Sequence, residues 1–280
     1  MNFETAPELR LFGESVRSAV GEWAPALEPQ LGTWLDDRDD ALAGRLDDAG
    51  WQELWSLDHL GAVVAGGLEL GRAVAPVSVL DEATLGAPLA IGGRVRHGAD
   101  TGTCAVPLDG WGLAIAPVTG ERTHEQTLDG SGTVVSGLAD AAPFSAADAE
   151  ARWDAWTTAT LAYLAGLADA ALAATVAHAR TREQFGRPLS ALPVVQARLA
   201  DAAVAVDGLE LTAWLASARP DGPRAPALLW SGSACRDVTA TAQQIHGAVG
   251  FALETGLHRY YRRAKAAQIW AAAVCRAARS

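Results

Sequence analysis

The 280-residue sequence predicts a mainly helical fold in three parts: an N-terminal helical domain over residues 1–93, a small β-domain over 94–148, and a C-terminal four-helix bundle over 149–280. Apolar residues recur every three to four positions before Gly93 and again after Ala149, which indicates helices with one buried face. Between these regions, short apolar runs alternate with Gly, Pro and Asp, as strands and turns do. Half of the residues are hydrophobic, so the chain can bury a core.

The N-terminal part contains three helical patterns. Apolar residues from Leu9 to Val20 keep a period of three to four. The charged segment Asp36–Gly50 carries leucines at similar spacing, and Gly50 is a suitable C-terminal stop. The segment His59–Leu80 predicts a helix that is ended by Pro76.

The remainder of the chain is predicted from its turn residues. The segment Arg94–Ala147 offers about four or five strands, at about 8–12 residues for each strand with its turn. Four long helices follow, interrupted by a Pro-rich loop at residues 218–226. They are predicted at about Ala149–Arg182, Pro193–Ala218, Ala227–His246 and Leu253–Ala278.

Composition narrows the class of protein. A net charge of −11 argues against a general nucleic-acid binder, although the C-terminal helix is locally rich in Arg. The three cysteines lack metal-ligand spacing and are interpreted as reduced thiols. The N-terminus resembles no signal peptide, and the apolar stretch Ala155–Ala168 is too short to span a bilayer. We therefore expect a soluble, cytoplasmic protein without a metal site.

Two segments resemble the signature regions of the acyl-CoA dehydrogenase family, flavoproteins that oxidise the α,β bond of acyl-CoA thioesters. They are TREQFGRPLSALPVVQARLAD (181–201) and QQIHGAVGFALETGLHRYYRRAK (243–265). The stretch ELGRAVAPVSVL (69–80) is similar to the end of a helix in the family's N-terminal domain. The resemblance is strongest after Thr160 and weakest in the middle, and it implies the family's fold with a contracted β-domain.

The first segment implies a cofactor contact. In the family, the residues that match Arg182 and Phe185 lie beside FAD, and the Arg reaches the pyrophosphate of a cofactor held mainly by the neighbouring subunit. A guanidinium suits this role because it stays charged and can bind two phosphate oxygens. Spacing alone allows a second interpretation, in which Arg182 is a cation at the C-terminus of a helix.

The second segment implies a glycine-rich turn against the adenosine diphosphate half of FAD. Glycine allows the backbone N–H groups of such a turn to approach a ligand closely. In this sequence Ala248 stands where the family usually has a second Gly. His246 is interpreted as a packed side chain and Glu254 as a structural carboxylate. The cofactor residues implied by the resemblance are Gln244, Gly247, Ala248 and Gly250.

The expected catalytic base is missing from both places where the family carries it. An ungapped match from the Arg-rich run puts one base position at Ala271, and the alternative position on the first C-terminal helix falls on Trp156. Next to Trp156, where relatives are expected to carry an Arg, this sequence has Thr157. Removal of the α proton requires a carboxylate. Asp154 has one and lies two residues before Trp156, so it is a weak candidate for the base.

These features together resemble the short subunit of actinobacterial heteromeric (α2β2) acyl-CoA dehydrogenases of sterol catabolism. The resemblance implies FAD as cofactor, an acyl-CoA substrate, and a second acyl-CoA dehydrogenase subunit that supplies the base. The last two helices, with Trp270 and the apolar run 271–274, are expected to contact that subunit. Two alternatives stay open: a non-catalytic scaffold without FAD, and a homo-oligomeric enzyme that uses Asp154 as its base.

Overall fold

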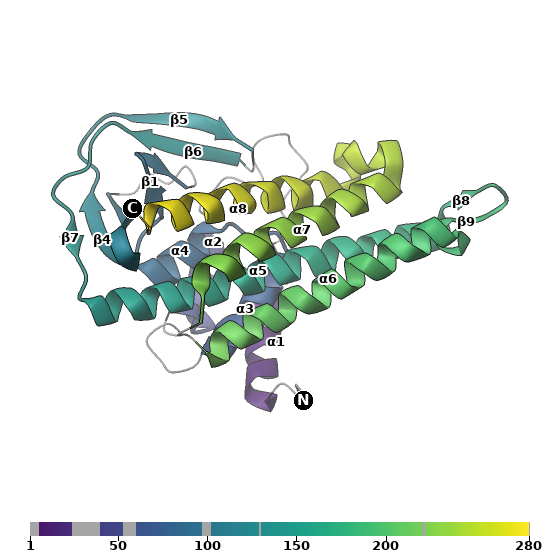
Figure 1. The fold of residues 1–280 in the computed structure, drawn as a ribbon, viewed down its shortest axis with the longest axis horizontal. Coiled ribbons are helices and arrows are strands. Elements are labelled where there is room, and N and C mark those ends of the chain that lie inside the picture. The colour runs from purple at the N-terminus through teal and green to yellow at the C-terminus, as the bar shows by residue number, and fades with distance from the viewer. Residues whose placement is uncertain are drawn as a thin grey trace.

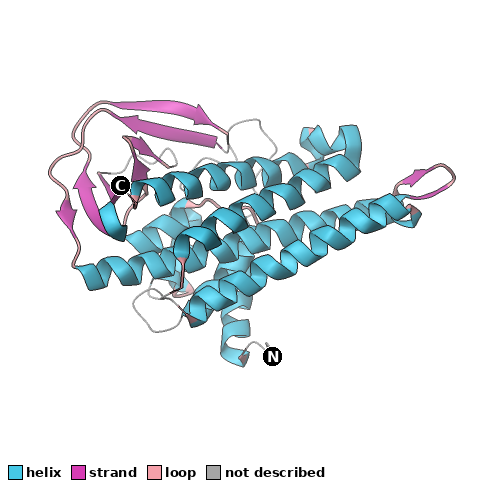
Figure 2. Cartoon of the chain, in the orientation of Figure 1, coloured by secondary structure: helices cyan, strands magenta, loops and turns pink. Residues whose placement is uncertain are grey.

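The computed structural model describes residues 6–23, 40–52, 60–96, 102–128, 130–219 and 222–279. Its long helices run roughly side by side, with most of the strands at one end of them, next to the C-terminus, and one short hairpin at the other end (Figures 1 and 2). The helices are α1 (Pro7–Trp23), α2 (Asp40–Asp48), α3 (Leu60–Arg72), α4 (Ser78–Leu85), α5 (Ala146–Thr181), α6 (Pro193–Ala218), α7 (Arg224–His246) and α8 (Leu257–Ala277). The mainly helical fold class with small sheets is therefore confirmed, and the domain boundaries stay a prediction.

The strands of the middle segment form two small antiparallel sheets. One has the order β1-β2-β6-β5 and the other β3-β4-β7. Their bounds are β1 (Ala90–Ile91), β2 (Arg94–Val95), β3 (Thr103–Leu108), β4 (Gly112–Pro117), β5 (Arg122–Thr127), β6 (Gly130–Val135) and β7 (Ala142–Pro143). The expected four or five strands over Arg94–Ala147 are too few, since the described residues there form six, and the two-residue strands β2 and β7 leave no periodic pattern in the sequence. The strand β1 lies in the part that was predicted as helical.

One predicted helix is wrong in its extent. The helix expected to end at Pro76 ends earlier, since α3 stops at Arg72 and a separate helix, α4, begins at Ser78 beyond the proline. Val74 adopts a φ of +55°, and the amide of Ala75 donates to the carbonyl of Leu70 at 2.9 Å, a pairing that closes the end of a helix. Pro76 then fixes φ and has no N–H to continue the helix. Residues 36–39 of the second predicted pattern lie outside the described residues.

The C-terminal helices follow the predictions more closely. The helix α6 has the predicted bounds, and α5 begins three residues earlier than expected. Its N-cap is Ser145, whose hydroxyl oxygen accepts from the amide of Asp148 at 3.1 Å. The helix α8 begins at Leu257 instead of Leu253, because residues 253–255 form a 3₁₀ turn closed by Gly256 at a φ of +63°.

The helix α5 is the centre of the fold. It packs on α3, α6 and α7, and Trp153, Trp156 and Tyr163 on it are among the largest fully buried side chains. By length and composition alone α5 could cross a membrane, but 67% of its most apolar window is buried inside the protein. This burial is what a core helix of the bundle requires.

Two residues of the ELGR stretch, Glu69 and Arg72, form ion pairs with other helices. The carboxylate of Glu69 accepts from the guanidinium of Arg17 on α1 at 2.8 Å. Arg72 pairs with Asp169 on α5 at 2.8 Å. The hydroxyl of Tyr260 donates to the Arg72 carbonyl at 3.4 Å, so this stretch connects α1, α3, α5 and α8.

Glycines allow α3 and α5 to cross with their backbones in contact. A Cβ on Gly166 would overlap the carbonyl oxygen of Leu68, and one on Gly71 would overlap that of Tyr163.

We expect Gly166→Ala to lower the free energy of unfolding by about 1–3 kcal/mol, since overpacking forces the backbones apart. Urea denaturation of the purified protein measures this. A suitable control is Gly44→Ala on α2, where the added methyl meets nothing within 4 Å and should stabilise the helix by about 0.5–1 kcal/mol. If both substitutions changed the free energy of unfolding equally, the backbones of α3 and α5 would not be in close contact at Gly166.

Candidate functional site

A short hairpin follows the C-terminus of α5 and carries the first predicted cofactor residues. The strands β8 (Glu183–Gln184) and β9 (Arg187–Pro188) pair, and the hairpin projects beyond the ends of α5 and α6 (Figure 1). Its two turn residues, Phe185 and Gly186, have φ values of +55° and +74°, which is the geometry of a two-residue type I′ turn. The Phe185 ring is 88% exposed, so the turn holds an aromatic side chain away from the core of its own chain.

Arg182 is the C-terminal cap of α5 and begins this hairpin. Its amide donates to the carbonyl of His178 at 2.9 Å, and its carbonyl accepts from the amide of Leu189 at 2.8 Å. Its backbone is therefore fixed while its side chain is exposed. No ion pair neutralises the guanidinium among the described residues, so its charge is available to an anion.

The second predicted segment forms the end of α7 and a 3₁₀ turn over residues 247–251. Gly247 has a φ of +66°, a conformation that favours glycine. A Cβ on Gly250 would come within 2.9 Å of the Gln243 carbonyl oxygen, so the tight turn requires a glycine there as well. Gln244 and Ala248 are exposed. The extra methyl of Ala248 therefore lies on the surface of the turn and not in the packing beneath it.

The structure brings these two segments to the same end of the bundle. The rings of His178 on α5 and His246 on α7 are stacked, with centroids 4.1 Å apart and planes 19° from parallel. Beneath them, Ala179, Val195 and Ile245 form a small apolar cluster. His246 also contacts the carbonyl of Ala242 through Nδ1 at 2.8 Å. The contacts of His246 are thus those of a packed side chain, and they hold the Arg182 hairpin next to the Gln244 turn.

The stacked histidines predict a pH dependence of stability. Burial, together with the nearby His246 and Arg182, lowers the pKa of His178. In the unfolded chain this pKa returns to about 6.5, so the unfolded state binds more protons as pH falls. We therefore expect the free energy of unfolding to decrease as pH falls from about 7 to about 5. The decrease should be shallower in His178→Gln, which urea titrations at several pH values would show. Parallel pH profiles for the two proteins would contradict the assignment.

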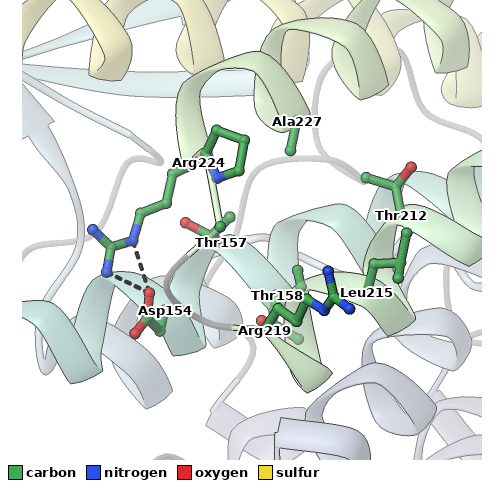
Figure 3. A pocket seen from close by; sticks show the side chains of 11 residues that line it. Asp154, Thr157, Thr158, Thr212, Leu215, Arg219, Arg224 and Ala227 are labelled. Carbon is green, nitrogen blue, oxygen red and sulfur yellow. Dashed lines mark hydrogen bonds and ion pairs between the residues drawn. The ribbon is translucent and has the colours of Figure 1, made fainter.

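Asp154, the weak candidate for the base, is held by an ion pair. Its carboxylate accepts from Nε of Arg224 at 2.8 Å and also from Nη2 of the same side chain (Figure 3). The Arg224 guanidinium lies 5.7 Å from the centroid of the Trp111 ring. A carboxylate that is fixed and neutralised in this way is poorly suited to take a proton from carbon.

The two usual base positions both lie in the hydrophobic core. Trp156 and Ala271 belong to the same cluster of buried residues and are 1% and 2% exposed. The indole Nε1 of Trp156 donates to the buried carboxylate of Asp81 at 2.8 Å. A carboxylate at position 271 would thus need space that core side chains fill.

A buried charged network lies beside these positions, and the sequence did not reveal it. Nη1 of Arg96 is 3.7 Å from Oδ1 of Asp81, and the amide of Leu89 donates to Oδ2 at 3.3 Å. Burial raises the pKa of the Asp81 carboxyl, whereas Arg96, Trp156 and Leu89 act in the opposite direction. Arg96 also lies over the ring of Trp270, at 5.9 Å from its centroid. Neither charged residue stands in a recognisable motif, so pairing could not be inferred without the fold.

The expected partner face on α8 needs correction. Ala271 and Val274 face the core of their own chain, and Trp270 is half-buried beneath Arg96. Ile269 is 50% exposed and is the large apolar side chain that this part of α8 presents outward. The apolar run 271–274 therefore packs mainly within the chain.

Solved structures show which fold this is. The chain matches a structure described as the Tcur3481–Tcur3483 steroid ACAD G363A variant, with a TM-score of 0.75 and 21% identity over 96% of both chains. It also matches the ChsE4–ChsE5 complex from Mycobacterium tuberculosis, with a TM-score of 0.74 and 22% identity over 98% of this chain and 96% of that one. Butyryl-CoA dehydrogenase from Megasphaera elsdenii has a TM-score of 0.73. The protein has the acyl-CoA dehydrogenase fold.

Sequence comparison places the C-terminal helices in the same family. Residues 156–271 match the family described as acyl-CoA dehydrogenase, C-terminal domain, so the resemblance inferred from the sequence is confirmed. The chain is 35% identical over 111 residues to the mitochondrial short-chain specific acyl-CoA dehydrogenase of Bos taurus. It is 37% identical over 123 residues to acyl-CoA dehydrogenase FadE27 of Mycobacterium tuberculosis. These alignments cover 38% and 39% of this chain but 27% and 33% of those relatives.

Proposed function

We propose that this chain is an oxidoreductase subunit of an FAD-dependent acyl-CoA dehydrogenase that works in a hetero-oligomer, with a second acyl-CoA dehydrogenase subunit supplying the catalytic base. The observation that carries the proposal is the end of the bundle described above. An uncompensated Arg182, an outward-held Phe185 and the Gly247 turn lie together on a surface that their own chain does not cover. This arrangement supports a contribution to a cofactor site shared with a neighbouring subunit.

The side chains at this end fit the diphosphate half of FAD. Arg182 would bind the pyrophosphate, because a guanidinium donates to two phosphate oxygens and remains charged. Phe185 offers an exposed ring for an apolar or aromatic surface, and Gln244 offers an exposed amide. When bound, FAD accepts the hydride that leaves the β carbon of the acyl group. This chain's residues would hold and orient the cofactor.

The same reasoning assigns proton removal to the partner. Asp154 is fixed by Arg224, and the positions 156 and 271 are occupied by core side chains. We propose an α2β2 arrangement, a sterol-derived acyl-CoA as substrate, and a cytoplasmic location. The similarity to the steroid ACAD and ChsE4–ChsE5 structures supports the partner and the sterol class.

Flavin content tests this proposal. The chain is purified alone and after co-expression with an acyl-CoA dehydrogenase subunit encoded beside it, and FAD is measured by absorbance after denaturation. We expect the complex to retain FAD and the chain alone to retain little. A stable complex without FAD would favour the alternative of a scaffold subunit. A flavin-loaded homo-oligomer that turns over acyl-CoA would favour the alternative in which Asp154 is the base.

The effect of Asp154→Asn separates these enzymatic alternatives. Turnover of the complex should stay within about threefold of the parent, since a carboxylate neutralised by Arg224 removes no proton in the proposed mechanism. If Asp154 were the base, the loss would be about a hundredfold or more. Stopped-flow reduction of the flavin by acyl-CoA measures the relevant step directly, and a collapse of its rate in Asp154→Asn would overturn our assignment.

A further inference from the structure

The helices α6 and α7 present a long, largely apolar face to solvent. They pack side by side and both contact α5 (Figure 1). On α6, the positions turned away from the core follow one another in alternating steps of three and four residues, which is the spacing of a coiled-coil seam. These positions, which we call the α6 stripe, are Val194, Ala197, Asp201, Val204, Gly208, Leu211 and Leu215. Such a seam normally packs against another helix, whereas here it is open to solvent.

The size of this face matches that of a stable protein–protein contact. Val204 is 72% exposed, and Trp230 of α7 is 46% exposed. The Trp230 ring lies against Gly208 of the α6 stripe, where a Cβ would come within 3.0 Å of it, so the ring extends the same surface. Two helices about 35–39 Å long and about 10 Å wide each cover roughly 700 Å². Stable complexes bury about 800 Å² on each partner, and exposed apolar patches of this size mark interaction sites.

The face carries both a large exposed ring and a groove that can receive one. The groove has a volume of about 390 Å³, lies between α6 and α7, and is bordered by Trp230. Small side chains, Ala202, Ala205 and Ala234, form much of its lining. The indole N–H of Trp230 and the Asp201 carboxylate beside the groove have no hydrogen-bond partner within the described part of the chain. A two-fold interface uses the same patch on both copies, so the ring of each copy can enter the groove of the other and donate to Asp201 there.

The charges around the groove also fit a second copy of this chain. The chain has a net charge of −11, so two copies repel each other over most of their surfaces. At the groove the charges are balanced, because Arg198 lines it together with Asp201, and Asp237 pairs with Arg236 at 2.8 Å. Two like-charged chains can therefore approach each other at this face without a net repulsion between the groups in contact.

We propose that the α6–α7 face binds a second copy of this chain, in a two-fold dimer whose α6 helices pack antiparallel. Val204 is at the midpoint of the α6 stripe, so it lies beside the two-fold axis and contacts its own counterpart. Asp201 then lies opposite Gly208 of the other copy, which is where the Trp230 ring of that copy is. The contact needs only this chain and does not rest on the proposed cofactor role. In the proposed α2β2 assembly it would join the two halves.

Light scattering on the purified full chain tests the dimer. At about 10 µM we expect twice the chain mass of 29.1 kDa. Val204→Glu should weaken the dimer at least about a hundredfold and give a monomer, because two carboxylates would face each other in a contact without water. The control Leu11→Glu adds the same charge at a 57% exposed position on α1 and should stay dimeric. Both variants should keep the circular dichroism of the parent, so a monomer cannot result from unfolding. A monomeric parent, or a dimeric Val204→Glu, would overturn the proposal.

Cross-linking tests the position of the axis. The native cysteines Cys104, Cys235 and Cys275 are buried, so a new exposed thiol is the one that reacts first. Val204→Cys should be linked into a covalent dimer by a short bis-maleimide, whereas Leu11→Cys should stay unlinked. Equal linking of the two variants, or none at position 204, would overturn the antiparallel arrangement.

The co-expressed complex separates this dimer from the cofactor role. There, Val204→Glu should yield a complex of half the parent mass with unchanged FAD content per partner subunit, because the Arg182 end of the bundle is untouched. Loss of the partner subunit together with FAD would show that the partner, and not a second copy, occupies the α6–α7 face. A parent complex without FAD would contradict the proposed function and leave the dimer of the chain alone intact.

Discussion

Replacing Arg182 with Ala should reduce the affinity of the co-expressed complex for FAD by roughly tenfold to a hundredfold. The substitution removes a charge-assisted hydrogen bond to phosphate, worth about 1.5–3 kcal/mol. Arg182 is exposed and its backbone is fixed by hydrogen bonds to His178 and Leu189, so the side chain can be lost without disturbing the hairpin. Flavin retention after serial dilution and rapid desalting measures the effect.

Two further variants separate this role from capping of α5. Arg180→Ala removes an exposed cation from the same last turn of the helix and should leave FAD retention unchanged. Arg182→Lys keeps the charge at the helix end but loses the two-pronged donor, so its FAD affinity should lie between those of the parent and Arg182→Ala. If FAD retention were the same in all three variants, Arg182 would act as a helix-terminal cation and not as a phosphate ligand.

The extent to which the sequence predicted the fold depended on the length of each pattern. The long helices were predicted well because apolar spacing over 20 or more residues leaves little choice, and α6 has the predicted bounds. The strands were undercounted, since two-residue strands such as Ala142–Pro143 are too short to show alternation. The break between α3 and α4 was placed too late because the helix already closes at Val74, in a left-handed conformation that β-branched residues rarely adopt.

The residues of the candidate site were predicted from motifs, whereas the contacts around them could not be predicted from the sequence. Arg182 and Gln244 were inferred separately, and the fold brings their segments together through the stacked rings of His178 and His246. The partner of Asp154 could not be foreseen, because Arg224 is 70 residues away and falls in the segment 218–226 that the sequence predicts as a Pro-rich loop, whereas it is the first residue of α7. Asp81 and Arg96 form a second such pair, between α4 and the residue that follows β2.

Replacing Asp81 with Ala should destabilise the protein by about 3–5 kcal/mol, the largest loss of stability that we predict. The carboxylate is fully buried and interacts with Arg96, with the indole of Trp156 and with the amide of Leu89. Without it, the Arg96 charge would remain in the core without its counter-ion, and removing one member of a buried pair is costly for this reason. A loss of this size is a large part of the 5–15 kcal/mol that typically stabilises a native protein.

Urea denaturation or soluble yield measures the loss of stability in Asp81→Ala, and two further variants serve as controls. Glu125→Ala breaks the exposed pair with Arg94 on the neighbouring sheet and should cost less than about 1 kcal/mol. The double variant Asp81→Leu/Arg96→Met removes both charges and should be markedly more stable than Asp81→Ala. A cost below 1 kcal/mol for Asp81→Ala would contradict the network.

The network also bears on catalysis, because it occupies the region where the family carries its base. Asp81 is hydrogen-bonded to Trp156, at one base position, and Arg96 covers Trp270, which precedes the other at Ala271. Introducing Ala271→Glu would add a carboxylate to this packed core, where Ala271 is 2% exposed. We therefore expect Ala271→Glu to lower the free energy of unfolding, as measured by urea denaturation. An unchanged free energy of unfolding in that variant would show that the core around position 271 still has room for a carboxylate.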